Sequence, residues 1–256
     1  MPASNKAWDK IFSDYFSDHD FDKEAALLTA DMIKDATRGF KETGEREVRI
    51  LAKIDSREDL PDVFKKRGLF ILPVKNGEYT IIKGEGFHDI QSPKSTPEAF
   101  KSRLTYELKS AAIGESEMQR LDYAFNTGLV HYFADVEGDL RLQIRGRKYT
   151  PVFEFFVGKF KIKVRSVQTE VDAGYEGRDV IILVEAKSFK QSNFIIRQLY
   201  YPFRQWSIRT GKNVRTMYYA YHPESKQHMF WEYAFKDPLN YNSILLTKSR
   251  AYVIQS

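Results

Sequence analysis

The 256-residue sequence contains no cysteine, so disulfide bonds and zinc sites built on cysteine are excluded. Its five histidines include no pair at the spacing of a zinc-binding helix such as H-E-x-x-H. Positive charge is in only slight excess: the sequence has 40 Lys and Arg and 35 Asp and Glu, which gives a net charge of +5. This mild basic excess is compatible with a polyanionic partner but does not require one.

Long apolar runs are also missing. The longest, such as 180–184, are far shorter than the ~20 residues that a membrane-spanning helix needs. Residues 1–12 lack the apolar segment of a secretory signal, so we expect a soluble cytoplasmic protein with no membrane partner. The composition, 42% hydrophobic and 29% charged, is that of an ordinary globular protein with one large domain or two smaller ones.

Residues 1–95 are expected to form an N-terminal α/β region. Apolar residues recur at helical spacing over 20–33, whereas 46–54 alternates as a strand does. A short helix is expected over 56–66, and Asn-Gly between two β-like runs predicts a hairpin over 69–83. The polar segment that follows, with its Gly, Ser and Pro residues, marks the expected boundary with a second region, residues 96–256.

The second region changes from helices to strands along the chain. Helices are expected at 97–110 and at 114–133, the latter with Ser116 as its N-cap. Strands are expected at 140–144, 152–157, 160–171, 180–187, 214–222 and 229–235. A helix is expected between the fourth and fifth of these, and Pro202 must kink or divide it. The predicted fold class is α/β (α+β), with a mixed central sheet flanked by helices.

The segment 168–187, QTEVDAGYEGRDVIILVEAK, carries the charged residues that point to chemistry. We expect a hairpin with the central Gly-Arg pair as a type II′ turn. Residues two apart on a strand share a face, and so do residues opposed across a hairpin. The predicted register therefore groups four side chains on one face, and a shift of one residue would break up the group. The four are Glu170, Asp172, Glu185 and Lys187.

Such a cluster suits phosphodiester hydrolysis. Neighbouring carboxylates resist ionisation unless a positive charge lies between them, and Mg²⁺ typically binds one or two carboxylates together with phosphate and water. Lys187 beside a metal-bound water would orient it or neutralise the phosphate in the transition state. The alternative is a solvated strand face with Glu–Lys pairs. Glu185 argues against that alternative, because it follows a run that is typical of a buried strand.

Asp172, a short hairpin and then Glu185-Ala186-Lys187 resemble the PD-(D/E)xK nuclease superfamily, over roughly residues 115–235. The core of that superfamily runs helix, three strands, helix, strand, which is similar to the order expected above. The phrases VDAGYEG and ILVEAK look most like type II restriction endonucleases. The resemblance implies a restriction-endonuclease-like core in which Asp172 and Glu185 bind Mg²⁺ and Lys187 assists the attacking water.

Two further acidic residues are candidate metal ligands. Val171 stands where the family pattern has proline, which leaves Glu170 as a rival or additional ligand beside Asp172. Members of the superfamily often carry an acidic residue on the helix before the first core strand, and Glu117 is the best match, with Glu115 behind it. Glu117 equally fits a glutamate that the helix dipole favours at a helix N-terminus.

Basic residues near the motif are candidate DNA contacts, because Lys and Arg neutralise phosphates and Arg also reads guanine edges. The densest basic stretch is 141–148, which also fits a solvent-exposed hairpin. The helix that follows the motif starts close to the predicted site and carries two Arg residues seven positions apart, on one side of a regular helix. The candidate DNA-binding residues are Arg145, Arg147, Lys148, Arg197, Gln198 and Arg204.

Together these features predict a Mg²⁺-dependent, site-specific endodeoxyribonuclease that cuts double-stranded DNA and leaves 5′-phosphate ends. Residues 96–256 would hold the catalytic core, and residues 1–95 would add DNA contacts or specificity. A homodimer would cut both strands together, whereas a monomer would nick each strand in turn. Two alternatives stay open: a DNA repair or structure-specific nuclease with the same core, and a non-catalytic DNA-binding module in which 141–148 is the wing of a winged helix.

Overall fold

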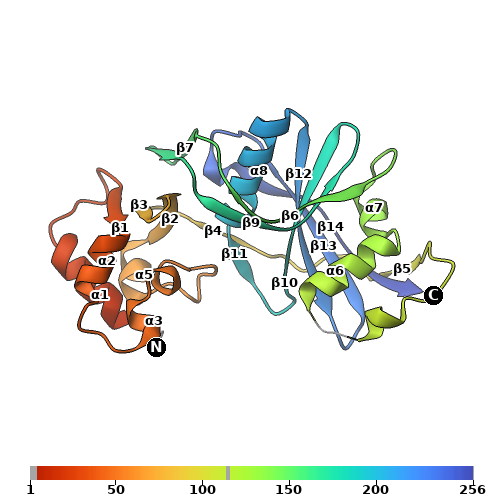
Figure 1. Cartoon of the computed structure of the whole chain (residues 1–256), viewed down its shortest axis with the longest axis horizontal. Coiled ribbons are helices and arrows are strands. Elements are labelled where there is room, and N and C mark those ends of the chain that lie inside the picture. The colour runs from red at the N-terminus through yellow and green to blue at the C-terminus, as the bar shows by residue number, and fades with distance from the viewer. Residues whose placement is uncertain (1–4, 114–115, 256) are drawn as a thin grey trace.

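The structure is a computed structural model that describes residues 5–113 and 116–255. It has two lobes that lie side by side (Figure 1). The N-terminal lobe, residues 5–83, is coloured red to yellow-orange, and the sheet lobe comprises the described residues from 84 onward. Among the described helices, none has both the length and the apolar character needed to cross a membrane.

The N-terminal lobe is a small antiparallel sheet, in the order β1-β3-β2, packed against short helices. Its elements are α1 (Asn5–Tyr15), β1 (Ala26–Thr29), α2 (Ala30–Ala36), α3 (Thr43–Arg46), α4 (Val48–Leu51), α5 (Asp62–Arg67), β2 (Leu69–Lys75) and β3 (Glu78–Lys83). Trp8 and Phe12 of α1 both meet the ring of Phe64 edge to face, which holds α1 against α5.

The hairpin predicted over 69–83 is confirmed, since β2 and β3 pair antiparallel around Gly77, whose φ of 76° favours glycine. The strand predicted over 46–54 is wrong. Only Leu51 and Ile54 of that stretch are buried, and a spacing of three residues suits helical turns rather than a strand. The helix predicted over 20–33 begins only at Ala30, because the four residues before it pair with β3.

The sheet lobe is built on a mixed seven-stranded sheet in the order β5-β14-β13-β12-β10-β9-β6. Its strands are β5 (Glu98–Lys101), β6 (Arg141–Tyr149), β9 (Gln168–Glu176), β10 (Val180–Ser188), β12 (Asn213–His222), β13 (Gln227–Phe235) and β14 (Ile244–Gln255). β10 and β12 run parallel and are joined through helix α8 (Arg197–Thr210), whereas β9 pairs antiparallel with both β10 and β6.

Helices flank both faces of this sheet, which confirms the predicted mixed sheet and the mixed α/β class (Figure 1). On one face α6 (Glu117–Asn126) and α7 (Leu129–Ala134) share a core with Ile182 and Val184 of β10. On the other face Ile181 and Leu183 pack against residues of α8. Because side chains alternate along a strand, Glu185 and Lys187 continue the α8 face near the end of β10.

The sheet lobe also contains two short antiparallel strand pairs and two 3-10 helices. β4 (Phe87–Asp89) pairs with β11 (Asn193–Ile195), and β7 (Phe153–Val157) pairs with β8 (Phe160–Val164). The 3-10 helices are η1 (Lys109–Ala112) and η2 (Tyr241–Ser243). The rings of Phe70 in the N-terminal lobe and Phe155 in β7 both stack on Tyr241, 5.9 and 5.8 Å away. One hydrophobic core therefore runs through both lobes.

Several predicted elements of the sheet lobe need correction. The helix predicted over 97–110 is wrong, because 98–101 forms the edge strand β5 and only its last residues enter η1. Ser116 is the N-cap as predicted, since its hydroxyl accepts a hydrogen bond from Gln119 N at 3.2 Å, but Gly128 divides the helix into α6 and α7. Residues 114 and 115 lie outside the described part of the chain. Pro202 lies within α8 and does not divide it.

Candidate active site

The hairpin of β9 and β10 forms as predicted, but its register differs by two residues. Its turn is Arg178-Asp179, closed by a hydrogen bond from Gly177 N to Val180 O at 2.8 Å, rather than Gly177-Arg178. Neither turn residue has the positive φ that a type II′ turn requires, so that part of the prediction is wrong. A shift of two residues, unlike a shift of one, keeps β10 and the part of β9 from Ala173 onward on their predicted faces. Val171, predicted to share a face with Val184, instead packs with Ile181 and Leu183 on the α8 face.

A β-bulge in β9 sets the position of Asp172. The pairing of β9 with β6 skips from Gly174–Ile144 to Val171–Gly146, so two residues of β9 stand where β6 has one. An added Cβ at Gly174 would lie 2.6 Å from the Cβ of Ile144, so this close approach of β6 requires glycine. The bulge lies just beyond the last β9–β10 pair, where Asp172 turns toward β10.

Two hydrogen bonds hold Asp172 in this position. Its Oδ2 accepts a hydrogen bond from Ala186 N at 2.8 Å, and its backbone carbonyl accepts one from Arg145 Nε at 3.1 Å. The Arg145 guanidinium also pairs with Asp122 of α6. Burial raises the pKa of the Asp172 carboxyl, although the bond from Ala186 N and the charge of Lys187 act in the opposite direction.

Glu185 is the most unusual charged group of the site, because it is only 8% exposed. Its Oε1 lies 2.9 Å from the Nζ of Lys187. Burial raises the pKa of Glu185 to about 7; Lys187 lowers it and the Asp172 carboxylate raises it further. Burial also disfavours the charged form of Lys187, but the neighbouring Glu185 outweighs burial and the pKa of Lys187 is raised. The lysine therefore stays protonated beside a carboxyl that titrates near neutral pH.

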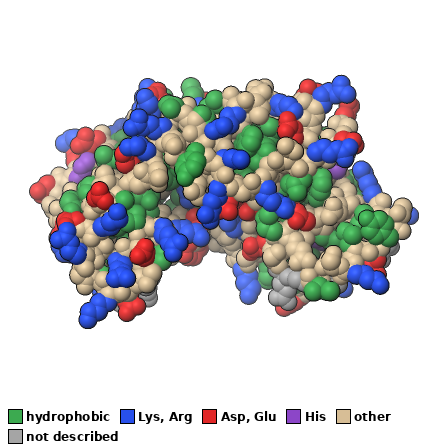
Figure 2. All heavy atoms as spheres, viewed as in Figure 1, with side chains coloured by type: hydrophobic (Ala, Val, Ile, Leu, Met, Phe, Trp, Pro, Cys, Tyr) green, Lys and Arg blue, Asp and Glu red, His purple; other side chains and the backbone are tan. Residues whose placement is uncertain are grey.

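These groups line a cavity of about 280 Å³ that both lobes form. The N-terminal lobe supplies Lys53 and Asp55, and α8 supplies Arg197 and Gln198. The hairpin supplies the four charged residues that the sequence grouped, Glu170, Asp172, Glu185 and Lys187. A second depression shares Asp55 and Lys187 with this cavity and continues along 56–59 and 190–192. Figure 2 shows the molecule hollowed on its lower side between the lobes, with Lys and Arg side chains on both sides of the hollow.

Three of the four predicted metal ligands, Glu170, Asp172 and Glu185, line the cavity. The Glu170 carboxylate is exposed and pairs with Arg147 at 3.4 Å, and Glu117 is exposed in the first turn of α6, outside the lining. Within residues 5–113 and 116–255, no group of three or more Asp, Glu, His or Cys side chains could hold a metal ion. Asp172 and Glu185 are the less exposed of the three predicted ligands in the lining, and we call them the acidic pair.

Five of the six predicted DNA-binding residues fall into two groups. Arg145, Arg147 and Lys148 are exposed on β6, which is an edge strand of the sheet, and Arg197 and Gln198 line the cavity at the start of α8. Arg197 pairs with Asp55 at 3.5 Å. The Oε1 of Gln198 is buried, with no hydrogen-bond partner among the described residues.

The prediction of Arg204 as a DNA contact needs correction, because Arg204 is a core residue. It is 9% exposed, and its Nη1 donates hydrogen bonds to the carbonyl oxygens of Glu154 and Pro238 and to the hydroxyl of Tyr200. Its guanidinium also lies 5.1 Å from the ring centroid of Phe153. The seven-residue spacing did not reveal this, since the β7–β8 hairpin and the 235–241 loop cover that part of α8.

Sequence reasoning missed Lys53 and Asp55 altogether. They lie more than a hundred residues before the motif; Lys53 falls in the stretch 46–54 that is wrongly predicted to be a strand, and Asp55 directly follows it. Neither residue belongs to a recognisable motif, so only the packing of the lobes brings them to the cavity.

The fold and the site together describe a mixed α/β protein with an acidic pair and a lysine at the end of a buried strand. Residues 82–253 match the family described as Domain of unknown function (DUF6997), and the chain belongs to that family. Residues 5–81 match a second family, Domain of unknown function (DUF6996). The cavity thus combines residues from both matched segments. No curated protein and no solved structure matches the chain.

Proposed function

We propose that this protein is a Mg²⁺-dependent endonuclease that hydrolyses phosphodiester bonds of double-stranded DNA. The observation that carries the proposal is Glu185, a nearly buried carboxyl with a pKa of about 7, beside a second carboxyl and a protonated lysine. Burial raises the pKa of Glu185 despite its pairing with Lys187, so a cation bound by both carboxylates would further stabilise the ionised form.

The donor set fits Mg²⁺. This hard cation takes oxygen ligands and commonly binds through one or two carboxylates, with water and substrate phosphate completing its coordination. Asp172 and Glu185 supply two carboxylates, and the unpartnered Oε1 of Gln198 in the same cavity can accept a hydrogen bond from a water. When bound, the metal ion would polarise the phosphate and lower the pKa of a coordinated water.

The chain's own residues would then orient and neutralise the reacting groups. The ammonium of Lys187, held at 2.9 Å from Glu185, would donate to the attacking water or to a phosphate oxygen and stabilise the charge that develops there. Arg197 and Lys187 line the same cavity, so both can face one phosphodiester group.

The order of elements also supports a restriction-endonuclease-like core. A helical segment of α6 and α7 comes first, followed by the strands β6, β9 and β10, then α8 and β12. This is the order helix, three strands, helix, strand that the PD-(D/E)xK resemblance implies, with β7 and β8 inserted after β6. Within that class we favour site-specific cleavage that leaves 5′-phosphate ends, either as a homodimer or as a monomer.

The test is incubation of the purified protein with mixed-sequence duplex DNA and Mg²⁺, followed by sequencing of the ends. Asp172→Asn keeps the oxygen that accepts from Ala186 N but removes the charge, so we expect cleavage to fall by at least ~10²-fold. The control is Asp179→Asn in the exposed turn of the same hairpin, which should cleave as the wild type does.

Each outcome has a meaning. Cuts at one sequence support a restriction-type enzyme, whereas cuts that follow branches or flaps indicate a repair or structure-specific nuclease with the same core. Cleavage that survives Asp172→Asn contradicts the assigned site. A wild type that binds DNA and never cleaves it supports the DNA-binding module, although 141–148 forms a sheet edge rather than a wing.

A further inference from the structure

The segment after α4 carries charged side chains from the N-terminal lobe into the cavity. The two carboxylate oxygens of Asp55 point to different cations: Oδ1 lies 3.5 Å from Arg197, and Oδ2 lies 3.7 Å from the Nζ of Lys53. Both cations line the cavity that also holds the acidic pair. One carboxylate of the N-terminal lobe therefore bridges a cation of its own lobe and a cation of α8.

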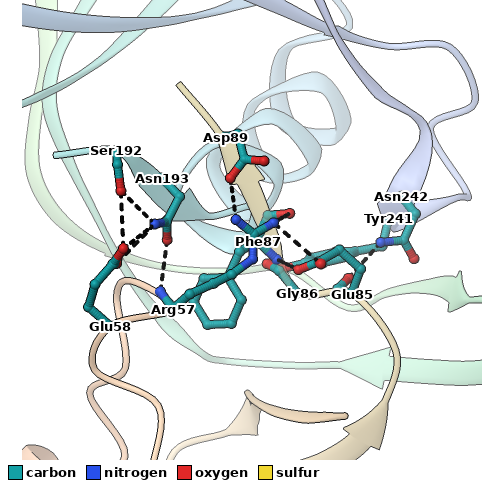
Figure 3. Close-up of polar contacts among 10 residues, drawn as sticks. All are labelled: Arg57, Glu58, Glu85, Gly86, Phe87, Asp89, Ser192, Asn193, Tyr241 and Asn242. Atoms are coloured by element: carbon teal, nitrogen blue, oxygen red, sulfur yellow. Dashed lines mark hydrogen bonds and ion pairs between the residues drawn. The ribbon is translucent and has the colours of Figure 1, made fainter. Parts of the chain in front are cut away.

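A polar cluster fixes this segment to the sheet lobe (Figure 3). Asn193, only 3% exposed, accepts a hydrogen bond from Arg57 N at 2.8 Å and donates to Glu58 at 2.9 Å. The Arg57 side chain pairs with Asp89 of β4, and Ile195 N donates to the carbonyl of Asp55 at 3.0 Å. The backbone of the segment is thereby tied to β11, directly before α8 begins.

One part of the cavity, formed by Lys53, Asp55 and Arg197, carries a positive excess that can bind an anion. Lys187 is already paired with Glu185, whereas Arg197 and Lys53 share a single carboxylate at distances longer than a close ion pair. The Nε of Arg197 is buried, with no hydrogen-bond partner within the described part of the chain, and the side chain of Lys53 is 73% exposed. Two cations and one carboxylate thus form a net positive group beside the acidic pair.

We propose that the active site is composite: Lys53, together with Arg197, binds a backbone phosphate of the DNA, and Asp55 is a positioning residue that holds both cations. The inference rests on the proposed function, since it names the part of the substrate that these residues contact. It makes the N-terminal lobe a part of the active site itself. A phosphate next to the scissile bond would be held from both lobes at once.

The first test measures binding of a labelled DNA duplex by fluorescence anisotropy, with Ca²⁺ in place of Mg²⁺ and at several salt concentrations. Lys53→Met should weaken binding by about 10-fold and reduce the slope of log K against log salt by about 0.9, the value for one lost phosphate contact. The matched control is Lys23→Met, an exposed lysine of the same lobe that pairs with Asp20. Its affinity and its slope should equal those of the wild type.

The second test separates positioning from simple charge. Removing a negative charge near a phosphate strengthens binding if Asp55 acts only through its charge. A positioning role predicts instead that Asp55→Asn lowers the single-turnover cleavage rate at saturating DNA by ~10-fold or more, with affinity equal to or above that of the wild type. Asp31→Asn is the control, because Asp31 also pairs with one nearby lysine, Lys34, at 3.2 Å.

These results can be told apart from failure of the proposed function. A wild type that cleaves DNA while Lys53→Met keeps the wild-type affinity and salt slope overturns the composite site. An unchanged single-turnover rate in Asp55→Asn overturns its positioning role. A wild type that binds duplex DNA without cleaving it overturns the nuclease, and the affinity of Lys53→Met still decides the phosphate contact. No binding at all overturns both.

Discussion

Replacing Glu185 by Gln should make the protein more stable at alkaline pH while it abolishes cleavage. Glutamine imitates the protonated carboxyl in shape, but it cannot ionise. The pKa of Glu185 is raised from its ordinary value of 4.5 to about 7, mainly by burial, so the unfolded chain releases this proton at lower pH than the folded one. The free energy of unfolding of the wild type therefore falls as pH rises from about 4.5 to about 7.

The size of the effect follows from the same two values. A pKa raised from 4.5 to about 7 costs the folded state about 3 kcal/mol once the carboxyl is fully ionised, at 1.36 kcal/mol per pH unit. Glu185→Gln removes this cost, so at pH 8 the variant should exceed the wild type by about 3 kcal/mol, or about 6 °C in Tm for a chain of this length. At pH 4.5 the two proteins should be nearly equal.

The assay is thermal denaturation of both proteins between pH 4.5 and pH 8, with and without Mg²⁺. Mg²⁺ should raise the Tm of the wild type at pH 8 and leave Glu185→Gln unchanged, because binding to the folded state alone stabilises it. The control is Glu137→Gln on the exposed loop after α7, which should show no pH-dependent difference. A Glu185→Gln variant that is less stable than the wild type at pH 8 would refute the idea that burial destabilises ionised Glu185 despite its pairing with Lys187.

Two further predictions test how the site is held. Arg204→Ala should lower the free energy of unfolding by about 3 kcal/mol, because buried carbonyl acceptors lose their donor, while the DNA affinity of the folded protein stays unchanged. Denaturant titration measures the stability and fluorescence anisotropy measures the affinity. A loss of affinity without a loss of stability would show that Arg204 contacts DNA. Gly174→Ala should cost about 1–3 kcal/mol and reduce cleavage, because the added Cβ would meet Ile144 at 2.6 Å and disturb the bulge beside Asp172. Gly39→Ala, where nothing lies within 4 Å of the added Cβ, is its control, and equal stability of the two variants would contradict the role of the bulge.

The hairpin could be predicted from the sequence because its information is local. Alternation along 180–187 defines the two faces of one strand, and an error of two residues in the turn preserves those faces. Glu185 and Lys187 therefore share a face despite the wrong turn, whereas Asp172 joins their cavity at the bulge in β9, which the sequence did not predict. The mixed sheet and its flanking helices were predictable for the same reason, since buried runs and the capping serine of α6 are contiguous signals.

The remaining features depend on contacts between distant segments. Residues 98–101 form a strand because they pair with β14 at the other end of the chain, although their local pattern favours a helix. Arg204 is buried by a hairpin and a loop that its own helix does not contain. Asp55 reaches the cavity only through the polar cluster around Asn193. The pattern of residues within one segment cannot predict contacts with segments that lie far away in the sequence.

The most direct test of the central claim is incubation of a supercoiled plasmid with wild-type protein and with Lys187→Met, each in Mg²⁺ and in EDTA. Lys187 lies 2.9 Å from Glu185 in the cavity, so we expect Mg²⁺-dependent nicking or linearisation by the wild type alone. In EDTA neither protein should cleave. Equal cleavage by the two proteins, or cleavage that persists in EDTA, would contradict a metal-dependent site built on Asp172, Glu185 and Lys187.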